Sequence, residues 1–250
     1  MARFDPGRLP YTGLTGNKGY SAIAAGPNGS TQYINLVTGK QGTGFTTAPG
    51  FIDGALGPAA IWANAVGNIS FPTGFSSNIF TAAAICRPTN LGVTNVFVSS
   101  DQVGDHGVDF RLSAGVVGAT LQAVIVISSG ITVTVNQPYF LATSRGPAKT
   151  HFVVVNLKTG QLSQATISDS NVALTGAGAN SSIGGLSGHS VGFTGYIGAA
   201  MISPVFITLP QLLAWATDPW SFWYPRMTAF YVGTAAVATR RLRMLVGAGQ

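Results

Sequence analysis

Apolar and polar residues alternate in short runs through the middle of the chain, from about residue 56 to residue 206. The clearest run is 131–135, where Ile and Val alternate with Thr, as expected of a half-buried strand. Turn signals such as Thr159-Gly160 separate the runs, and this spacing predicts a sandwich or barrel rather than alternating strands and helices. The predicted strands are 59–63, 68–71, 79–87, 94–99, 108–113, 119–127, 131–135, 151–156, 162–167, 181–184 and 191–206, the last of which could be two.

One helix is predicted near the end of this region. Thr208 and Gln211 have the spacing of a capping box, in which the two residues bond each other's backbone N–H groups. Pro210 falls in the first turn, where its missing N–H has no cost. Asp218-Pro219 then ends the helix. We expect this short helix to close one end of the sandwich.

The two ends of the chain have a different pattern. Residues 1–55 are punctuated by Gly, Pro, Thr and Asn, and their apolar runs are short. They predict an extended arm with one or two strands, held by this domain or by a second copy. The expected organisation is an N-terminal arm (1–55), a β-sandwich (56–220) and an aromatic, then basic, C-terminal arm (221–250).

Charge is scarce in this chain. Hydrophobic residues make up 46% of the sequence and charged residues only 8%, against about 25% in an average soluble domain. All seven acidic residues are Asp, and the chain contains no Glu. So few charges do little to keep copies apart. The composition therefore favours a protein that buries much of its exterior against neighbours.

Aromatic and basic residues gather near the C-terminus, where several Arg contribute to the net charge of +6. Aromatic side chains beside Arg are typical of interface anchors, although these could equally pack onto their own sheet. The Arg residues could bind an acidic patch on a partner, and a dedicated nucleic-acid binder would show more Lys and Arg along one face. The predicted interface residues are Trp220, Phe222, Trp223, Tyr224, Arg240, Arg241 and Arg243.

One group of carboxylates is dense enough to suggest a metal site. Asp101, Asp105 and Asp109 lie within nine positions, together with His106, and could bind a hard cation such as calcium. Their spacing does not fit the EF-hand loop. The alternative is a polar hairpin loop between two strands. We expect no cofactor, with calcium as the alternative.

Candidate nucleophiles give no enzyme signature. Cys86, the only cysteine, lies in a strand-like run and is predicted to be a buried, inert thiol. Gly188-His-Ser-Val-Gly192 matches the Gly-x-Ser-x-Gly pattern of hydrolases, but that motif needs a helix after it, and here a strand is predicted. We interpret it as a glycine-rich turn. Glycosidases act with two carboxylates, usually Glu on this kind of fold, and the chain has no Glu. A non-enzymatic function is predicted.

Targeting signals are not apparent in the sequence. Residues 1–10 lack the apolar core of a signal peptide. No stretch is long and apolar enough to span a bilayer. We expect neither export nor membrane insertion.

Four segments, in the same order, resemble the concanavalin A-like lectin/glucanase (laminin-G-like) superfamily, in the form found in bacteriophage virion proteins. The resemblance covers roughly residues 35–225 and ends on Asp218-Pro219-Trp220. It implies a two-sheet antiparallel jelly roll. It also implies a packing role for His151. The segments are 57–72, 80–88, 182–185 followed by 193–202, and 207–220.

Departures from the superfamily pattern concern acidic residues. The chain has Ala63-Asn64 and Gly67-Asn68 where the family often has Asp-Gly and Asp-Tyr. It has Gly198-Ala199 where the family often has an acidic residue. Metal-binding members use carboxylates on rim loops, so a calcium site of the family type is not expected.

Composition and resemblance together predict a non-enzymatic structural protein of a bacteriophage virion, either a capsid decoration (cement) protein or a tail or fibre component. Its expected partners are other virion proteins and copies of itself, with assembly in the host cytoplasm; nucleic acid and membranes are not expected partners. The alternative is a carbohydrate-binding module for host-surface glycans, in which aromatic rings on a concave sheet stack on sugars.

Overall fold

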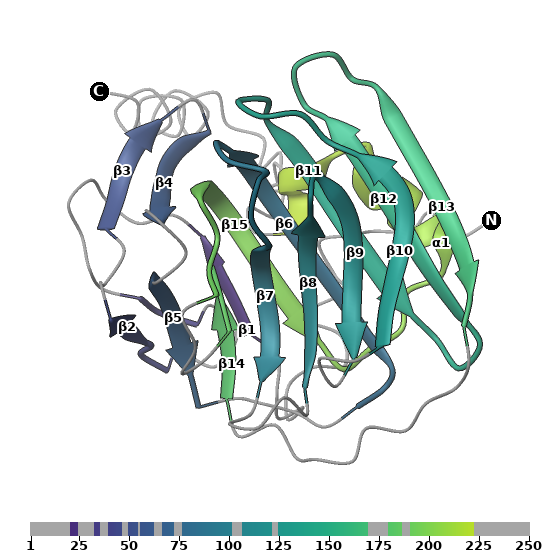
Figure 1. Cartoon of the computed structure of the whole chain (residues 1–250), viewed down its shortest axis with the longest axis horizontal. Coiled ribbons are helices and arrows are strands. Elements are labelled where there is room, and N and C mark those ends of the chain that lie inside the picture. Colours follow the sequence, from purple (N-terminus) through teal and green to yellow (C-terminus); the bar gives the residue numbers. More distant parts are fainter. Residues whose placement is uncertain are drawn as a thin grey trace, which may run out of the picture.

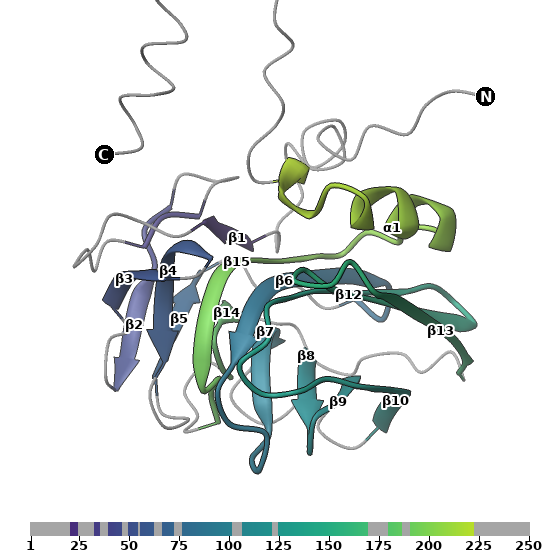
Figure 2. The ribbon, with the colours of Figure 1, turned by 90° about the horizontal axis from the view of Figure 1, so that it is seen from above.

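Two antiparallel β-sheets packed face to face form the body of the molecule, with one α-helix over one outer face (Figures 1 and 2). The structure is a computed structural model. This architecture confirms the predicted all-β, two-sheet antiparallel sandwich with one short C-terminal helix. The residues described are 21–24, 33–35, 40–46, 50–54, 56–62, 67–72, 77–101, 107–121, 125–169, 180–186 and 191–222.

The larger sheet has eight strands in the order β13-β12-β11-β6-β15-β4-β3, with β1 also paired to β15. Along β15, β4 pairs with residues 195–197 and β1 with residues 199–202, so both share one side of that strand. Gly198 lies between them, where the register between β15 and β6 shifts. The strands are β1 (Ser21–Ala24), β3 (Gly50–Gly54), β4 (Gly57–Trp62), β6 (Phe80–Pro88), β11 (Tyr139–Arg145), β12 (Lys149–Asn156), β13 (Leu162–Ser168) and β15 (Gly195–Ser203).

The smaller sheet has seven strands in the order β10-β9-β8-β7-β14-β5-β2. Four of them, β7 to β10, form an antiparallel meander, as short runs separated by tight turns predict. β14 comes late in the sequence and joins β7 to β5. The strands are β2 (Thr43–Thr46), β5 (Gly67–Phe71), β7 (Asn95–Asp101), β8 (Val108–Ser113), β9 (Val116–Leu121), β10 (Ile125–Thr132) and β14 (Asn180–Ile183).

The hydrophobic core fills the space between the sheets. Successive residues of a strand point to opposite faces, so alternate residues of β6, β8 and β11 enter it. Three aromatic rings pack together in this core. The centroid of the Phe97 ring lies 5.3 Å from that of Phe110 and 5.2 Å from that of Phe193. Such tilted pairs are favourable beyond their buried area.

A second hydrophobic cluster lies on the outer face of the eight-stranded sheet, under helix α1 (Leu209–Ala216). The Trp215 ring packs 5.2 Å from the Phe140 ring, between centroids, and its Nε1–H donates to the carbonyl of Pro219. The N–H of Thr208 donates to Gln211 Oε1 at 2.9 Å, which confirms the predicted helix start. The expectation that this helix closes one end is wrong. Its apolar face instead covers the outer face of the eight-stranded sheet over β11 and β12 (Figure 2).

Two of the predicted strands, 119–127 and 131–135, need correction. The run 131–135 is not a strand of its own, because β10 ends at Thr132; Val133 is buried in the core although it lies beyond the strand. The run 119–127 is not one strand, because β9 ends at Leu121 and β10 begins at Ile125. β11 was not predicted, because its side chains are buried on both faces and show no alternation. The segment predicted as an N-terminal arm supplies three short strands, β1, β2 and β3, which pair within the two sheets. The arm and domain boundaries themselves stay predictions.

Candidate functional site

Among the described residues, helices cover only one of the two outer faces of the sandwich. Helix α1 and the 3-10 helix η2 (Pro219–Phe222) lie over the eight-stranded sheet, on the side away from β7 to β10 (Figure 2). No helix among the described residues covers the outer face of the seven-stranded sheet. The polar residues on this face form the candidate site.

A row of polar residues runs straight across that face. Strand register aligns one residue from each of six neighbouring strands, each directly opposite the next. Val126 of β10 ends the row and is exposed. We call these six residues the polar row: Thr43, Ser70, Ser182, Ser99, Asp109 and Thr120.

Hydrogen bonds fix the middle of the polar row. The hydroxyl oxygens of Ser99 and Ser182 lie 2.7 Å apart, and both hydroxyls also bond the carbonyl of Gly185. The chain therefore turns back over the row directly after β14. A Cβ on Gly185 would lie 2.7 Å from the carbonyl oxygen of Val191 and 2.9 Å from Cβ of Asn68. Only glycine fits this close approach of two backbone segments.

The charged part of the face lies on β8. Asp109 faces Ser99 on one side and Thr120 on the other, and Arg111 Nε lies 3.4 Å from Asp109 Oδ1. Arg111 is the more exposed of the pair, with 19% of its side chain accessible. Thr120 Oγ1 is buried and has no hydrogen-bond partner among the described residues. Asp109 and Thr120 are buried, so Arg111 is the charged group of this part of the face that a ligand rich in hydroxyl groups can reach, as a hydrogen-bond donor.

Of the three candidate calcium ligands, Asp101 and Asp109 lie among the described residues. Asp109 lies on the sheet face beside Arg111, and Asp101 ends β7 opposite Asn180. Asp105 and His106 lie outside the described residues. No group of three His, Cys, Asp or Glu side chains that could hold a metal ion occurs among the residues the structure describes. Calcium binding stays an untested alternative.

The histidine that the resemblance assigned to packing lies on the outer face of β12. His151 Nδ1 lies 2.9 Å from Thr166 Oγ1, and its ring lies 5.8 Å from the Phe206 ring, between centroids. Burial, and then the positive charge of Lys149, lower the pKa of His151. A neutral ring held by a hydroxyl and an aromatic neighbour fits a structural role.

Only the last two residues of the Gly-x-Ser-x-Gly match, Val191 and Gly192, lie among the described residues. Its Gly192 bridges to Gly185, and β15 follows it. A nucleophile elbow would instead lead into a helix. Residues 187–190, which include the serine, lie outside the described part of the chain. The predicted strand after the motif is confirmed.

Cys86 lies in the core between the sheets and is fully buried. Burial in apolar surroundings raises the pKa of its thiol far above the usual value. Because the thiolate is the reactive form, the native protein should not react with a thiol-specific disulfide reagent over an hour, and should react completely in denaturant. Spectrophotometric titration with and without guanidinium checks this, and rapid labelling of the native protein would contradict it.

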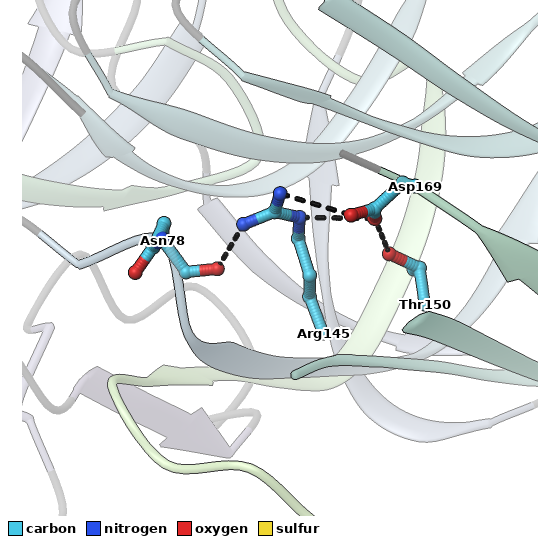
Figure 3. Close-up of polar contacts among 4 residues, drawn as sticks. All are labelled: Asn78, Arg145, Thr150 and Asp169. Carbon is cyan, nitrogen blue, oxygen red and sulfur yellow. Dashed lines mark hydrogen bonds and ion pairs between the residues drawn. The ribbon is translucent and has the colours of Figure 1, made fainter. Parts of the chain in front are cut away.

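Arg145 and Asp169 form a buried ion pair at one end of the sandwich (Figure 3). No pattern in the sequence predicts this pair. Arg145 Nε and Nη2 donate to the two carboxylate oxygens of Asp169 at 3.1 and 3.0 Å. Arg145 also donates to the carbonyl of Asn78, and the Thr150 hydroxyl donates to Asp169. These bonds tie β11, the start of β12, the end of β13 and the segment before β6 together. Their role is structural.

The predicted interface residues are placed only in part. Trp220 packs against the outer hydrophobic cluster, close to Gly198. Phe222 ends η2. The remaining predicted interface residues, Trp223, Tyr224, Arg240, Arg241 and Arg243, lie outside the described residues. The interface assignment therefore stays a prediction. In the part of the chain that the structure describes, no helix has the length and hydropathy needed to cross a bilayer.

No known family and no curated protein matches this sequence, but solved structures share its fold. Domain 4 of AbnA, a GH43 extracellular arabinanase from Geobacillus stearothermophilus in complex with arabinotriose, matches with a TM-score of 0.58 and 18% identity over 79% of this chain and 98% of that one. The enzymatically active domain of tailspike protein 2 of bacteriophage CBA120 matches with a TM-score of 0.51 and 13% identity over 71% of this chain and 30% of that one.

The binding domain of botulinum neurotoxin serotype G matches with a TM-score of 0.52 and 12% identity, over 79% of this chain and 50% of that one. This chain thus spans less than two thirds of both the tailspike and the neurotoxin domain. At these identities the similarity shows the fold alone, which is a lectin-like jelly roll.

Proposed function

We propose that this chain is a non-enzymatic structural protein of a bacteriophage virion, either a capsid decoration (cement) protein or a tail or fibre component. The observation that carries the proposal is its scarcity of charge. Only 8% of residues are charged, and the strands at one flank, β10 and β13, have no charged residue. Neutral surfaces of this kind suit permanent contact with neighbouring proteins. The fold shared with a phage tailspike supports the same assignment.

Electron microscopy of intact particles tests this proposal. Antibodies against the purified chain, coupled to gold, should label one fixed position on the head or the tail. Cryo-electron microscopy of the same particles should show a β-sandwich of this size there. A chain that is present in infected cells but absent from purified particles would contradict a virion role.

Glycan binding is the second candidate function, favoured by the polar row on the outer face of the seven-stranded sheet and by the partly exposed Arg111 beside it. Arg111 lies on this face beside the buried Asp109, and its partly exposed guanidinium can donate hydrogen bonds to sugar hydroxyls. The arabinanase domain of the same fold was solved with arabinotriose, which supports this use of the fold. The two functions are compatible in a protein that both decorates a particle and adheres to cell surfaces.

A glycan array, run with and without calcium, checks the second candidate. We expect Arg111→Gln to weaken any binding by about 10- to 100-fold, because a hydrogen bond from a charged donor is lost. Lys158→Gln, which changes an exposed cation in the turn after β12, is the matched control and should bind as the unmodified chain does. Absence of binding in both calcium conditions would leave only the structural role.

A further inference from the structure

The strands at the edges of the two sheets are not equally protected. Outward-facing backbone groups of an edge strand can pair with another chain unless the strand is short, charged or bulged. β1 and β2 have four residues each, and β3 carries Asp53. β10 has an irregular register between Ser128 and Thr132 around Gly130, whose φ is 72°. β13 has seven residues with no charge, no proline and no register shift.

Two hydrogen bonds show which backbone groups of β13 face outward. The N–H of Asn156 donates to the carbonyl of Gln161, and the N–H of Asp169 donates to the carbonyl of Ala148. Hydrogen-bonded and non-bonded pairs alternate along an antiparallel ladder, and the register between these two bonds is unbroken. The odd-numbered residues 161–169 therefore bond to β12. The residues that direct their N–H and C=O groups to the open edge are Leu162, Gln164, Thr166 and Ser168.

We propose that β13 pairs antiparallel with β13 of a second copy, about a two-fold axis at Ala165. The two eight-stranded sheets then become one continuous sheet. In this register Leu162 faces Ser168, Gln164 faces Thr166, and Ala165 faces its own copy, so no like charges meet. The outward groups form about eight hydrogen bonds between the copies.

No strand among the described residues pairs with the outer edge of β13. Figure 1 shows β13 at the outer margin of the sandwich, on the opposite side from β2 and β3. Helix α1 contacts β11 and β12, and alternate side chains of β13 remain exposed beside it. A closed two-fold pair uses both open edges at once, so assembly stops at the dimer. This inference is independent of what the polar row binds.

Sedimentation velocity of the full chain over a range of concentrations tests the dimer. Gln164→Pro removes an N–H that faces outward and leaves the β12–β13 ladder intact. We expect it to raise the dimer dissociation constant by about 10- to 100-fold, because symmetry removes two interchain bonds. Gln164→Thr keeps the N–H and should remain dimeric. A monomeric unmodified chain, or a folded Gln164→Pro that dimerises as before, would overturn the proposal.

Disulfide trapping tests the register and does not depend on the proline variant. Ala165→Cys places two thiols at a non-bonded antiparallel pair, within reach of a disulfide. It should yield a covalent dimer under mild oxidation. The native Cys86 is buried and should not form a competing disulfide. Ser168→Cys is the matched control, because its two copies would lie about 20 Å apart along the strands. Equal crosslinking of both variants, or of neither, would refute this pairing.

Discussion

Replacing Asp169 by alanine should lower the free energy of unfolding by about 3–5 kcal/mol, the usual cost of leaving one member of a buried ion pair alone. Arg145 has no exposed side-chain surface and donates two hydrogen bonds to Asp169. Without the carboxylate, its guanidinium stays buried with its charge uncompensated. Guanidinium-induced unfolding, followed by tryptophan fluorescence, measures the change.

The double variant Arg145→Met/Asp169→Leu is the control for this prediction. It removes both charges and fills the space with apolar atoms, so it should be far less destabilised than Asp169→Ala. A double-mutant cycle then separates the pair energy from the packing loss. If Asp169→Ala unfolds at the same denaturant concentration as the unmodified chain, the pair does not stabilise this end of the sandwich.

Replacing Trp215 by alanine should cost about 3–5 kcal/mol, since it removes the largest fully buried side chain of the molecule's described part. Its ring packs on Phe140, and its N–H bonds the carbonyl that begins η2. The loss should detach α1 from the sheet before the sandwich unfolds. Hydrogen exchange of residues 209–216 measures this local opening.

Trp215→Phe separates packing from the hydrogen bond. It keeps an aromatic ring on Phe140 but loses the N–H donor, so a smaller loss of stability is expected. If exchange in α1 is unchanged in Trp215→Ala, the outer cluster does not hold the helix.

Alternation and turn signals were enough to predict most strands. The segments 108–113 and 162–167 match β8 and β13, because each has one buried and one more exposed face. The helix start was also predicted from the sequence, since a capping box is a local interaction between residues three apart.

Strands without these signals were missed. β11 is buried on both sides, between the core and the helix-covered face, so neither face is polar. β9 and β10 were merged because their connection contains no Gly, Pro, Asn or Asp. The sequence therefore contains no turn signal between the two strands.

The candidate site depends on register, which sequence patterns do not specify. Asp109 was noticed as part of a local Asp cluster, yet its neighbours across the sheet are Ser99 and Thr120. Arg145 and Asp169 are 24 residues apart and meet only because β11, β12 and β13 are adjacent in the sheet. Contacts between strands distant in sequence leave no local trace.

The late insertion of two strands has a consequence for synthesis on the ribosome. β14 connects β7 to β5, and β15 connects β6 to β4 and β1. A nascent chain that has not yet been translated as far as Asn180, where β14 begins, thus lacks the strands that join the two halves of each sheet. Long-range pairing of this kind folds slowly. Chaperones that shield the open edges of these halves during translation should therefore raise the yield of folded protein.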